Sequence, residues 1–301
     1  MTWPRGLAGL LLPALLLLAD CGSRTAPDVP QDSALARATD AGRQSLEFSR
    51  VKQAVDQYRQ AFTLAMARDD AQAIGDGGYN LAVAELADND AAGALRTTRR
   101  TRDALAARGA PGFAELDLIQ SAALHRLGRD AEADVLAARA QATAGNPVTQ
   151  ARASYVRGLI ADARGDAAGI AAALAGFGQP KTPSADWEAD RDELMARLDM
   201  LHGQNRQAAA HAQQAADLHR AQLNYRAMAD ATALAAKAMQ RAGSPRDAAN
   251  LYLQAGESAA ARGDAASATR WLRQAMGPGA GPDTQRAAKE ALAALQKARP
   301  G

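Results

Sequence analysis

Six short turn sequences divide most of this 301-residue chain into segments of similar length. In each of them an apolar helical pattern stops at Gly or Asn, and Asp, Asn or Ser follows within two residues. Gly and Asn accept the left-handed conformation that ends a helix, and the following polar residue can cap the next helix. The first five turns are spaced about 37–40 residues apart, which is the period of a repeat made of two helices. The six turns centre on Asn89, Gly128, Gly165, Gly203, Gly243 and Gly263.

The composition indicates helices. Alanine makes up about a quarter of the chain, and it has the highest intrinsic helix propensity of all residues. Aromatic residues amount to 4%, and no stretch alternates apolar and polar residues for long. We therefore expect an all-α protein.

The charge pattern argues against a nucleic-acid partner. The net charge is +2 and the two signs are interspersed. The one dense basic cluster, residues 96–102 (RTTRRTR), carries no aromatic residue for base stacking. It is predicted to be the solvated face of a helix, with contact to anionic lipid or an acidic partner as the alternative.

Small residues recur at a fixed distance from the turns. Alanine stands five residues after the turn centre in five of the six turns, and Ile170 takes its place in the other. This pattern resembles the tetratricopeptide repeat, over roughly residues 45–276 and best from Gln222 through Ala255. The resemblance implies an α-solenoid of antiparallel helical hairpins. Because the period exceeds the usual ~34 residues, a related α-solenoid is the alternative. The alanines are Ala94, Ala133, Ala208, Ala248 and Ala268.

Residues that favour helix starts support this register. Four positions are each predicted to begin the first helix of a hairpin: Asp69-Asp70, Pro111, Pro147 and Pro183-Ser184. The array is predicted to end with two single helices, Asp264 to Met276 and Asp283 to Ala298, that cap it.

Three glycines, Gly75, Gly77 and Gly78, fall inside a helix predicted from about Asp70 to Asp88. A phosphate-binding loop would need a preceding strand or a following Lys-Ser/Thr, and the sequence has neither. We therefore expect close packing of a neighbouring helix on these glycines, or a local break.

The N-terminus resembles a bacterial lipoprotein signal. A positively charged start is followed by about 14 apolar residues, too few to span a bilayer, and then by Leu18-Ala19-Asp20-Cys21. The resemblance implies that Cys21, the only cysteine, is lipidated with palmitate among its acyl chains. Asp20 departs from the pattern, which has a small residue there. Ordinary secretion or an uncleaved anchor is the alternative.

These features predict three parts: a signal peptide over residues 1–20, a flexible tether over 21–32, and a helical-repeat domain over 33–301 with capping helices at its end. Gly22 after the cysteine favours the outer membrane, by the sorting pattern of enterobacterial lipoproteins. We therefore expect a periplasm-facing protein anchored by lipid, with secretion to the periplasm as the alternative.

Few aromatic side chains are available for binding. Tyr79, Tyr155, Trp187 and Tyr225 fall on predicted first helices, which line the groove of a solenoid. Each is either an anchor for a partner in that groove or a filler of the space left by neighbouring alanines.

The sequence nominates no catalytic group, cofactor or metal site. His211 and His219 lie two helical turns apart, too far to share a metal ion, and the histidines are expected on the surface. The carboxylates of Asp190, Asp192 and Glu193 are expected in charge pairs on a helix surface. The predicted function is a lipid-anchored periplasmic scaffold that binds a protein or peptide, in an envelope-assembly role. The alternative is an envelope enzyme or a solute-binding subunit, for example one acting on peptidoglycan.

Overall fold

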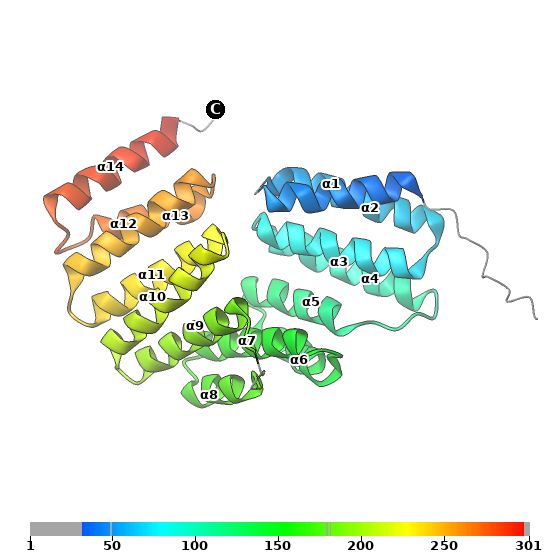
Figure 1. Cartoon of the computed structure of the whole chain (residues 1–301), viewed down its shortest axis with the longest axis horizontal. Helices are drawn as coiled ribbons and strands as arrows, with labels where there is room; N and C mark the ends of the chain where they lie inside the picture. Colours follow the sequence, from blue (N-terminus) through cyan, green and yellow to red (C-terminus); the bar gives the residue numbers. More distant parts are fainter. Residues whose placement is uncertain (1–31, 49, 179, 181, 298–301) are drawn as a thin grey trace, which may run out of the picture.

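The computed structural model describes residues 32–48, 50–178, 180 and 182–297. These residues form fourteen α-helices and no strand, which confirms the predicted all-α class. Consecutive helices pack as seven antiparallel hairpins (Figure 1). In chain order the hairpins are α1 (Ser33–Glu47) with α2 (Val51–Arg68), α3 (Ala71–Ala87) with α4 (Ala91–Ala106), α5 (Ala114–Arg126) with α6 (Asp130–Thr143), α7 (Pro147–Ala163) with α8 (Ala167–Gly176), α9 (Ala185–Leu201) with α10 (Asn205–Ala221), α11 (Tyr225–Arg241) with α12 (Pro245–Ala261), and α13 (Ala265–Ala275) with α14 (Pro282–Lys297).

The six predicted turns have the left-handed conformation. The φ angles of the five glycines and of Asn89 lie between 65° and 77°, so this prediction is confirmed. Gly263 lies between two hairpins rather than inside one, because α12 precedes it and α13 follows. Asp69, Gly109 and Leu223 adopt the same conformation at junctions that the turn pattern did not predict.

Aspartates that follow the turns cap the next helices. Asp90, Asp166 and Asp264 each accept the backbone N–H of the residue three positions later, at 2.7, 2.9 and 3.1 Å. Each bond satisfies one of the N–H groups that a helix start leaves without a partner. Asp130 differs, because it lies within the first turn of α6 and pairs with Nδ1 of His125 at 2.8 Å.

Three of the four predicted helix starts are correct. Asp70 and Ser184 are the N-caps of α3 and α9, and Pro147 is the first residue of α7. Pro111 does not begin a helix, because α5 begins at Ala114. Gly112 follows this proline, and its low helix propensity favours a later start.

The position five residues after each turn centre is buried in every repeat. The five alanines there are at most 3% exposed, and Ile170 is fully buried. A small side chain at this position lets the two helices of a hairpin approach closely. The predicted packing positions are therefore confirmed.

The glycines of α3 lie where neighbouring helices come closest. A Cβ on Gly77 would stand 3.2 Å from the backbone Cα of Phe62 in α2. A Cβ on Gly78 would overlap the side chain of Thr101 in α4, which is fully buried. Helix α3 continues through both positions, so close packing is the correct alternative and a local break is not.

Gly78→Ala should lower the free energy of unfolding by about 1–2 kcal/mol in urea denaturation. The added Cβ overpacks the α3–α4 contact, which costs about 1–3 kcal/mol, and displaces Thr101 from its hydrogen bond to the carbonyl of Thr97 at 2.8 Å. The gain in helix propensity offsets about 1 kcal/mol of this. Gly112→Ala is the matched control, because a Cβ there meets nothing within 4 Å. A Gly78→Ala protein as stable as this control would contradict the close contact.

The last two helices form a hairpin of their own instead of two single caps. Helix α14 packs against both α12 and α13, and its buried Ala288 joins the apolar cluster around Trp271 and Leu272. The same cluster includes Tyr252 and Ala259 on α12. The hairpin α13–α14 therefore covers an apolar face of α12.

Deleting residues 264–301 should convert the protein to aggregated or frayed species in size-exclusion chromatography. The deletion exposes Tyr252, which is 8% exposed in the intact protein, together with the alanines beside it. A terminal repeat with an apolar outer face does not stay soluble. Arg286→Ala, which removes only an exposed ion pair of α14, is the control and should remain monomeric. A monomeric, cooperatively melting deletion variant would refute the capping role.

Candidate binding site between the two arms

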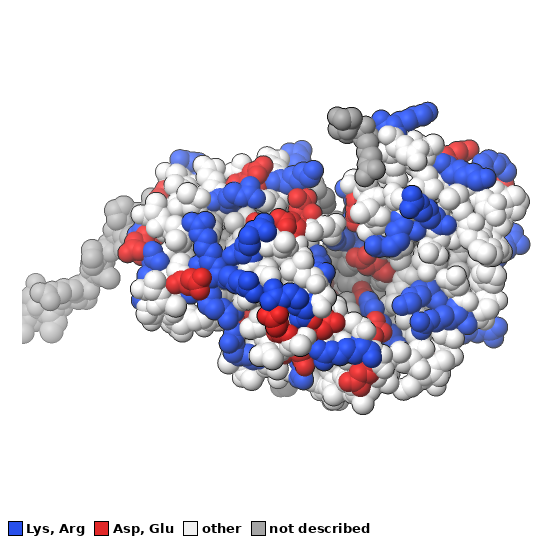
Figure 2. All heavy atoms as spheres, turned by 180° about the vertical axis from the view of Figure 1, so that it is seen from behind, with Lys and Arg blue, Asp and Glu red and all other residues white. Residues whose placement is uncertain are grey.

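From α3 to α11, the first helix of each hairpin lies on the inner side of the curve. Helices α3, α5, α7 and α9 each contact the next first helix, past the helix between them. First helices that contact each other lie nearer the centre of curvature than the second helices between them. Two arms result, α1–α5 and α9–α14, which face each other across a gap (Figure 1). Seen from behind, the surface is hollowed between them, with acidic and basic side chains on its walls (Figure 2).

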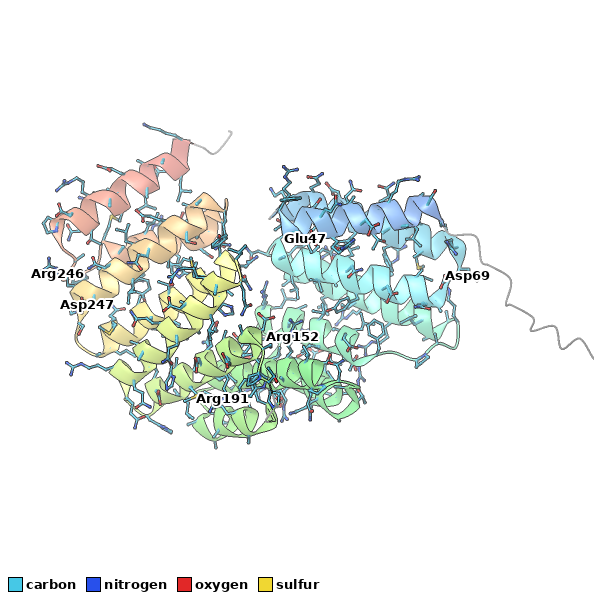
Figure 3. The ribbon with its side chains drawn as sticks, in the orientation of Figure 1. Glu47, Asp69, Arg152, Arg191, Arg246 and Asp247 are labelled. Atoms are coloured by element: carbon cyan, nitrogen blue, oxygen red, sulfur yellow. The ribbon has the colours of Figure 1, made fainter. Side chains whose placement is uncertain are left out.

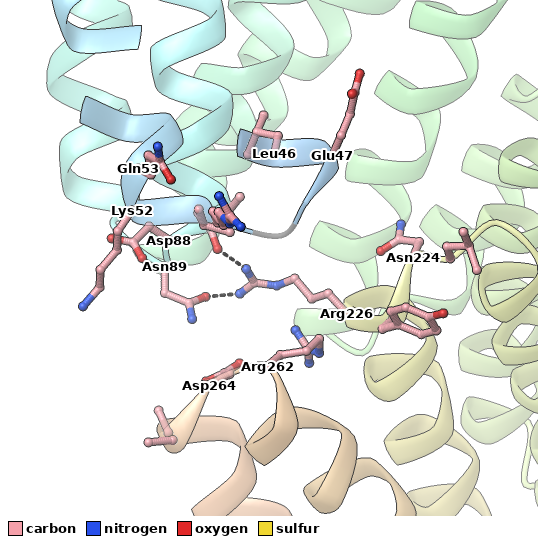
Figure 4. Close-up of a pocket in the computed structure, with 18 of the residues that line it drawn as sticks. Leu46, Glu47, Lys52, Gln53, Asp88, Asn89, Asn224, Arg226, Arg262 and Asp264 are labelled. Carbon is pink, nitrogen blue, oxygen red and sulfur yellow. Dashed lines mark hydrogen bonds between the residues drawn. The ribbon is translucent and has the colours of Figure 1, made fainter. Parts of the chain in front are cut away.

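Two arginines, one from each arm, bond to the end of α3. Arg226 of α11 donates to the carbonyl of Ala87 and to the side-chain oxygen of Asn89 (Figure 4). Arg126 of α5 donates to the carbonyl of Leu86 at 2.6 Å. The carbonyls at a helix C-terminus carry partial negative charge and lack partners within the helix, so guanidinium groups stabilise them. Arg226 is therefore a contact that holds the C-terminal arm against the N-terminal arm.

A hollow of about 1010 Å³ lies around this contact, and we call it the inter-arm hollow. Four turns surround it, two from each arm. Glu47, at the end of α1, lies at the gap, whereas Asp69, Arg246 and Asp247 lie on the outer ends of the arms (Figure 3). The turn segments that line the hollow are residues 46–47 and 50–53, 87–89, 222–226 and 262–266.

Four charged side chains on the inner side form no ion pair with any described residue. Among the described residues, none of them has an ion-pair partner within 4 Å; they are Arg126, Asp190, Asp230 and Arg262. Surrounding protein raises the pKa of Asp230 and raises that of Asp190 to about 7, and the charge of Glu193 adds to both shifts. Burial also lowers the pKa of Arg126 and Arg262, and nearby Arg226 lowers both further.

All four shifts favour the neutral form. Side chains such as Asp230 remain open to solvent, but protein on several sides displaces much of the water that would stabilise their charges. Nε and Nη2 of Arg262 are buried and have no hydrogen-bond partner among the described residues. Clusters of ionisable groups perturbed in this way are typical of functional sites.

A buried polar network stabilises the inner wall beside these charges. Tyr155 of α7 donates its hydroxyl to Oε2 of Glu193 on α9 at 2.7 Å. Nε2 of His219, on α10, lies 3.4 Å from Oε1 of the same carboxylate. Arg197 lies 3.6 Å from Oε2 and donates to Asp162 at 2.8 Å. The network joins α7, α9 and α10.

The network is held in its ionised form. Burial on its own raises the pKa of Glu193, but His219, Arg197 and the Tyr155 hydroxyl more than offset this, so the net shift is downward. Burial on its own lowers the pKa of His219, and Glu193 reverses the shift to a net rise. Burial raises the pKa of Tyr155, and the charge of Glu193 raises it further, so the phenol stays neutral and donates.

Two expectations about this region are wrong. Glu193 does not form a charge pair on a helix surface, because only 5% of it is exposed. His219 is not a surface histidine, because only 4% is exposed. Sequence patterns favour the surface for both, because charged residues are rarely buried without partners. Here each supplies the partner of the other, from two different helices.

The four predicted aromatic residues do not share one surface. Tyr155 and Trp187 pack in the same apolar cluster, and the Tyr155 hydroxyl belongs to the buried network. Tyr79 lies half-buried on α3, with its ring centroid 6.5 Å from that of Phe113. Tyr225 is 44% exposed and is the one of the four that lines the inter-arm hollow.

The other sequence expectations concern charge, metals and the membrane. Arg96, Arg99 and Arg100 are exposed on α4, as predicted for a solvated helix face. Within the described part of the chain, no three His, Cys, Asp or Glu side chains lie together as a metal site. No described helix combines the length and apolarity that crossing a membrane requires. Cys21 and the predicted signal peptide lie outside the described residues.

The fold and the hollow define the class of this protein: it is an α-solenoid of helical hairpins. No protein-family model matches the chain, and no curated protein sequence matches it significantly. Solved structures of similar shape are tetratricopeptide repeat proteins, the family that the turn pattern resembles.

Three of these structures are as follows. One is a tetratricopeptide repeat protein from Parabacteroides merdae, with 13% identity over 87% of this chain and 99% of that chain, and a TM-score of 0.47. The C-terminal part of a TPR repeat-containing protein from Cytophaga hutchinsonii has 12% identity over 84% and 98%, with a TM-score of 0.44. The TPR2AB domain of yeast Sti1, in a complex with pHSP90, has 14% identity over 81% and 98%, with a TM-score of 0.34.

Proposed function

We propose that this protein is a binding scaffold whose partner, a protein or peptide, inserts a segment into the inter-arm hollow. The observation that carries the proposal is a group of charges around Arg226 that have no ion-pair partner among the described residues. Arg262 lines the hollow, and Arg126 and Asp230 lie close enough to Arg226 for its charge to shift their pKa values. A segment with complementary charges would pair them where little water competes.

The shape of the hollow supports the same role. Turns from both arms surround it, so an extended segment can contact widely separated parts of the chain at once. Its volume of about 1010 Å³ lies at the upper end of the range typical of ligand pockets. The Arg226 contact between the arms fixes the width of the opening.

Site-specific photo-crosslinking in cells tests this proposal. A photoreactive amino acid at Asn224, which lines the hollow, should yield a discrete adduct with one partner. The same amino acid at Asp247, on the outer end of α12, is the control and should not yield that adduct. Asp230→Arg should weaken the adduct formed from position 224, because it reverses an inner charge.

Two outcomes would contradict the proposal. One is the same adduct from the outer position 247, which would place the interface elsewhere. The other is an adduct from position 224 that persists at full yield in the Asp230→Arg protein, because the inner charges would then contribute nothing to binding.

We further propose that the scaffold is anchored by lipid on Cys21 at the periplasmic side of the bacterial outer membrane, in a role in envelope assembly. The support is the sequence: a short positive start, an apolar run and Cys21 as the only thiol, followed by Gly22.

Cys21→Ser should abolish palmitate labelling and release the protein from the membrane fraction, because the serine offers no thiol for the thioether. Ser23→Ala, two residues further on, is the matched control and should keep both the label and the membrane association. Unchanged labelling of the Cys21→Ser protein would refute lipidation at this residue.

A further inference from the structure

A second cavity, of about 360 Å³, lies where the start of α7 meets the start of α9. Its walls are largely apolar. Val148 and Ala151 come from α7, Phe177 from the end of α8, and Trp187 from α9. Val148 is 58% exposed, which leaves apolar surface open at the entrance.

The aromatic wall of this cavity is held in place. Nε1 of Trp187 donates to the backbone carbonyl of Phe177 at 3.2 Å. The two rings lie edge to face, with centroids 5.9 Å apart and an interplanar angle of 76°. The guanidinium of Arg191 lies 5.8 Å from the Trp187 centroid, so this ring is already in contact with one cation (Figure 3 labels Arg191). Because the indole is tethered and packed, the wall is formed before any ligand arrives.

One carboxylate in the cavity forms no ion pair with any described residue. Asp190 lines the cavity and makes no ion pair within 4 Å among the described residues. Asp186, also in the cavity wall, lies 3.6 Å from Arg152 on the exposed rim. The charged groups that act on Asp190 are Glu193 on its own helix, Arg152 and Asp186 in the cavity wall, and His219 on α10. Arg152 pairs with Asp186, and Glu193 pairs with His219.

We propose that this cavity binds a basic side chain, with its aliphatic stem along Val148 and Trp187 and its cationic head at Asp190. Lysine and arginine combine these two parts, because their stems pack on apolar surface while the head stays polar. The aromatic wall adds attraction for a cation. A neutral apolar side chain would leave Asp190 unpaired, and an acidic one would be repelled by it.

This inference rests on the proposed function and deepens it, because it states the chemistry of the partner segment. The cavity adjoins the inter-arm hollow through Gln222, which lines the hollow. In the amide orientation that satisfies both residues, its carbonyl oxygen accepts the backbone N–H of Asp186 at 3.0 Å. A segment in the hollow that carries a lysine or arginine can therefore place it in the cavity.

The test needs no partner protein. Ligand-observed NMR titrations of the full chain at pH 8 would compare acetyl-Gly-Lys-Gly-amide with the same peptide carrying norleucine, which keeps the stem and lacks the charge. The lysine peptide should bind at least about tenfold tighter, as expected for one charge-assisted hydrogen bond. Asp190→Asn should remove this preference, and Asp56→Asn, on the exposed side of α2, should leave it intact.

Equal affinity for the two peptides, no detectable binding of the lysine peptide, or a preference that survives in the Asp190→Asn protein would each overturn the inference. A thermal melt of Asp190→Asn at pH 8, which we expect to match or exceed that of the parent, excludes misfolding as the cause of lost binding. Peptide binding without a crosslink at position 224 would refute the proposed function alone. A crosslink without lysine selectivity would refute only the basic-side-chain site.

Discussion

Glu193→Ala should lower the free energy of unfolding by about 3–5 kcal/mol, the typical cost of removing one partner from a buried ion pair. The substitution leaves Arg197 with a positive charge at a site where little water can reach it, and it leaves the hydroxyl of Tyr155 without an acceptor. It also removes the carboxylate that raises the pKa of the buried His219, which then favours its neutral form. Urea denaturation followed by circular dichroism measures the change.

Two variants serve as controls for this result. Glu193→Gln keeps the size and an oxygen acceptor for Tyr155 but removes the charge, so its loss of stability should be intermediate. Glu132→Ala removes the exposed ion pair with Arg129 on α6 and should change stability by less than about 1 kcal/mol. If Glu193→Ala costs no more than Glu132→Ala, the network does not join the three helices.

Asp190→Asn should stabilise the protein at pH 8 and have little effect near pH 4. Burial and the charge of Glu193 raise the pKa of Asp190 from 3.8 to about 7. In the unfolded chain the carboxyl ionises near its ordinary pKa, whereas in the folded protein it stays protonated up to about pH 7. Its contribution to stability is therefore fully present below pH 4 and is lost as the pH rises toward and through 7.

The size of this effect follows from the shift. About three pKa units correspond to at most about 4 kcal/mol at pH 8. The groups that set the pKa, besides burial, are Glu193, Arg152, His219 and Asp186. Unfolding free energies of the two proteins, measured from pH 4 to pH 8, should diverge over this range. Parallel pH profiles would show that Asp190 is fully solvated.

Asp190 is predicted to destabilise the folded state at neutral pH, and it lies in a cavity with a preformed aromatic wall. This combination is typical of a residue that serves binding. Natural proteins often keep such residues at functional sites at some cost in stability. The two largest predicted effects therefore distinguish the roles of neighbouring residues on α9: Glu193 is predicted to stabilise the fold, and Asp190 is proposed to bind a basic side chain.

The sequence by itself determined the local structure. The glycines and Asn89 of the six turns, the alanines five positions later and the caps at Asp90, Asp166 and Asp264 depend on backbone conformation and on neighbours within one hairpin. Such interactions span few residues, so the sequence pattern contains them. Leu223 shows the limit, because a leucine in a left-handed turn carries no glycine signal.

Only the tertiary structure decided the site. Arg226 bonds to the turn after α3, 137 to 139 residues earlier in the chain, and the position of that turn depends on small rotations accumulated over several hairpins. Glu193 and His219 lie on different helices, and their burial follows from how α9 packs on α7 and α10 packs on α9. Helical periodicity assigns a residue to a face of its helix. What lies opposite that face is set by the curvature of the whole array, which no local pattern encodes.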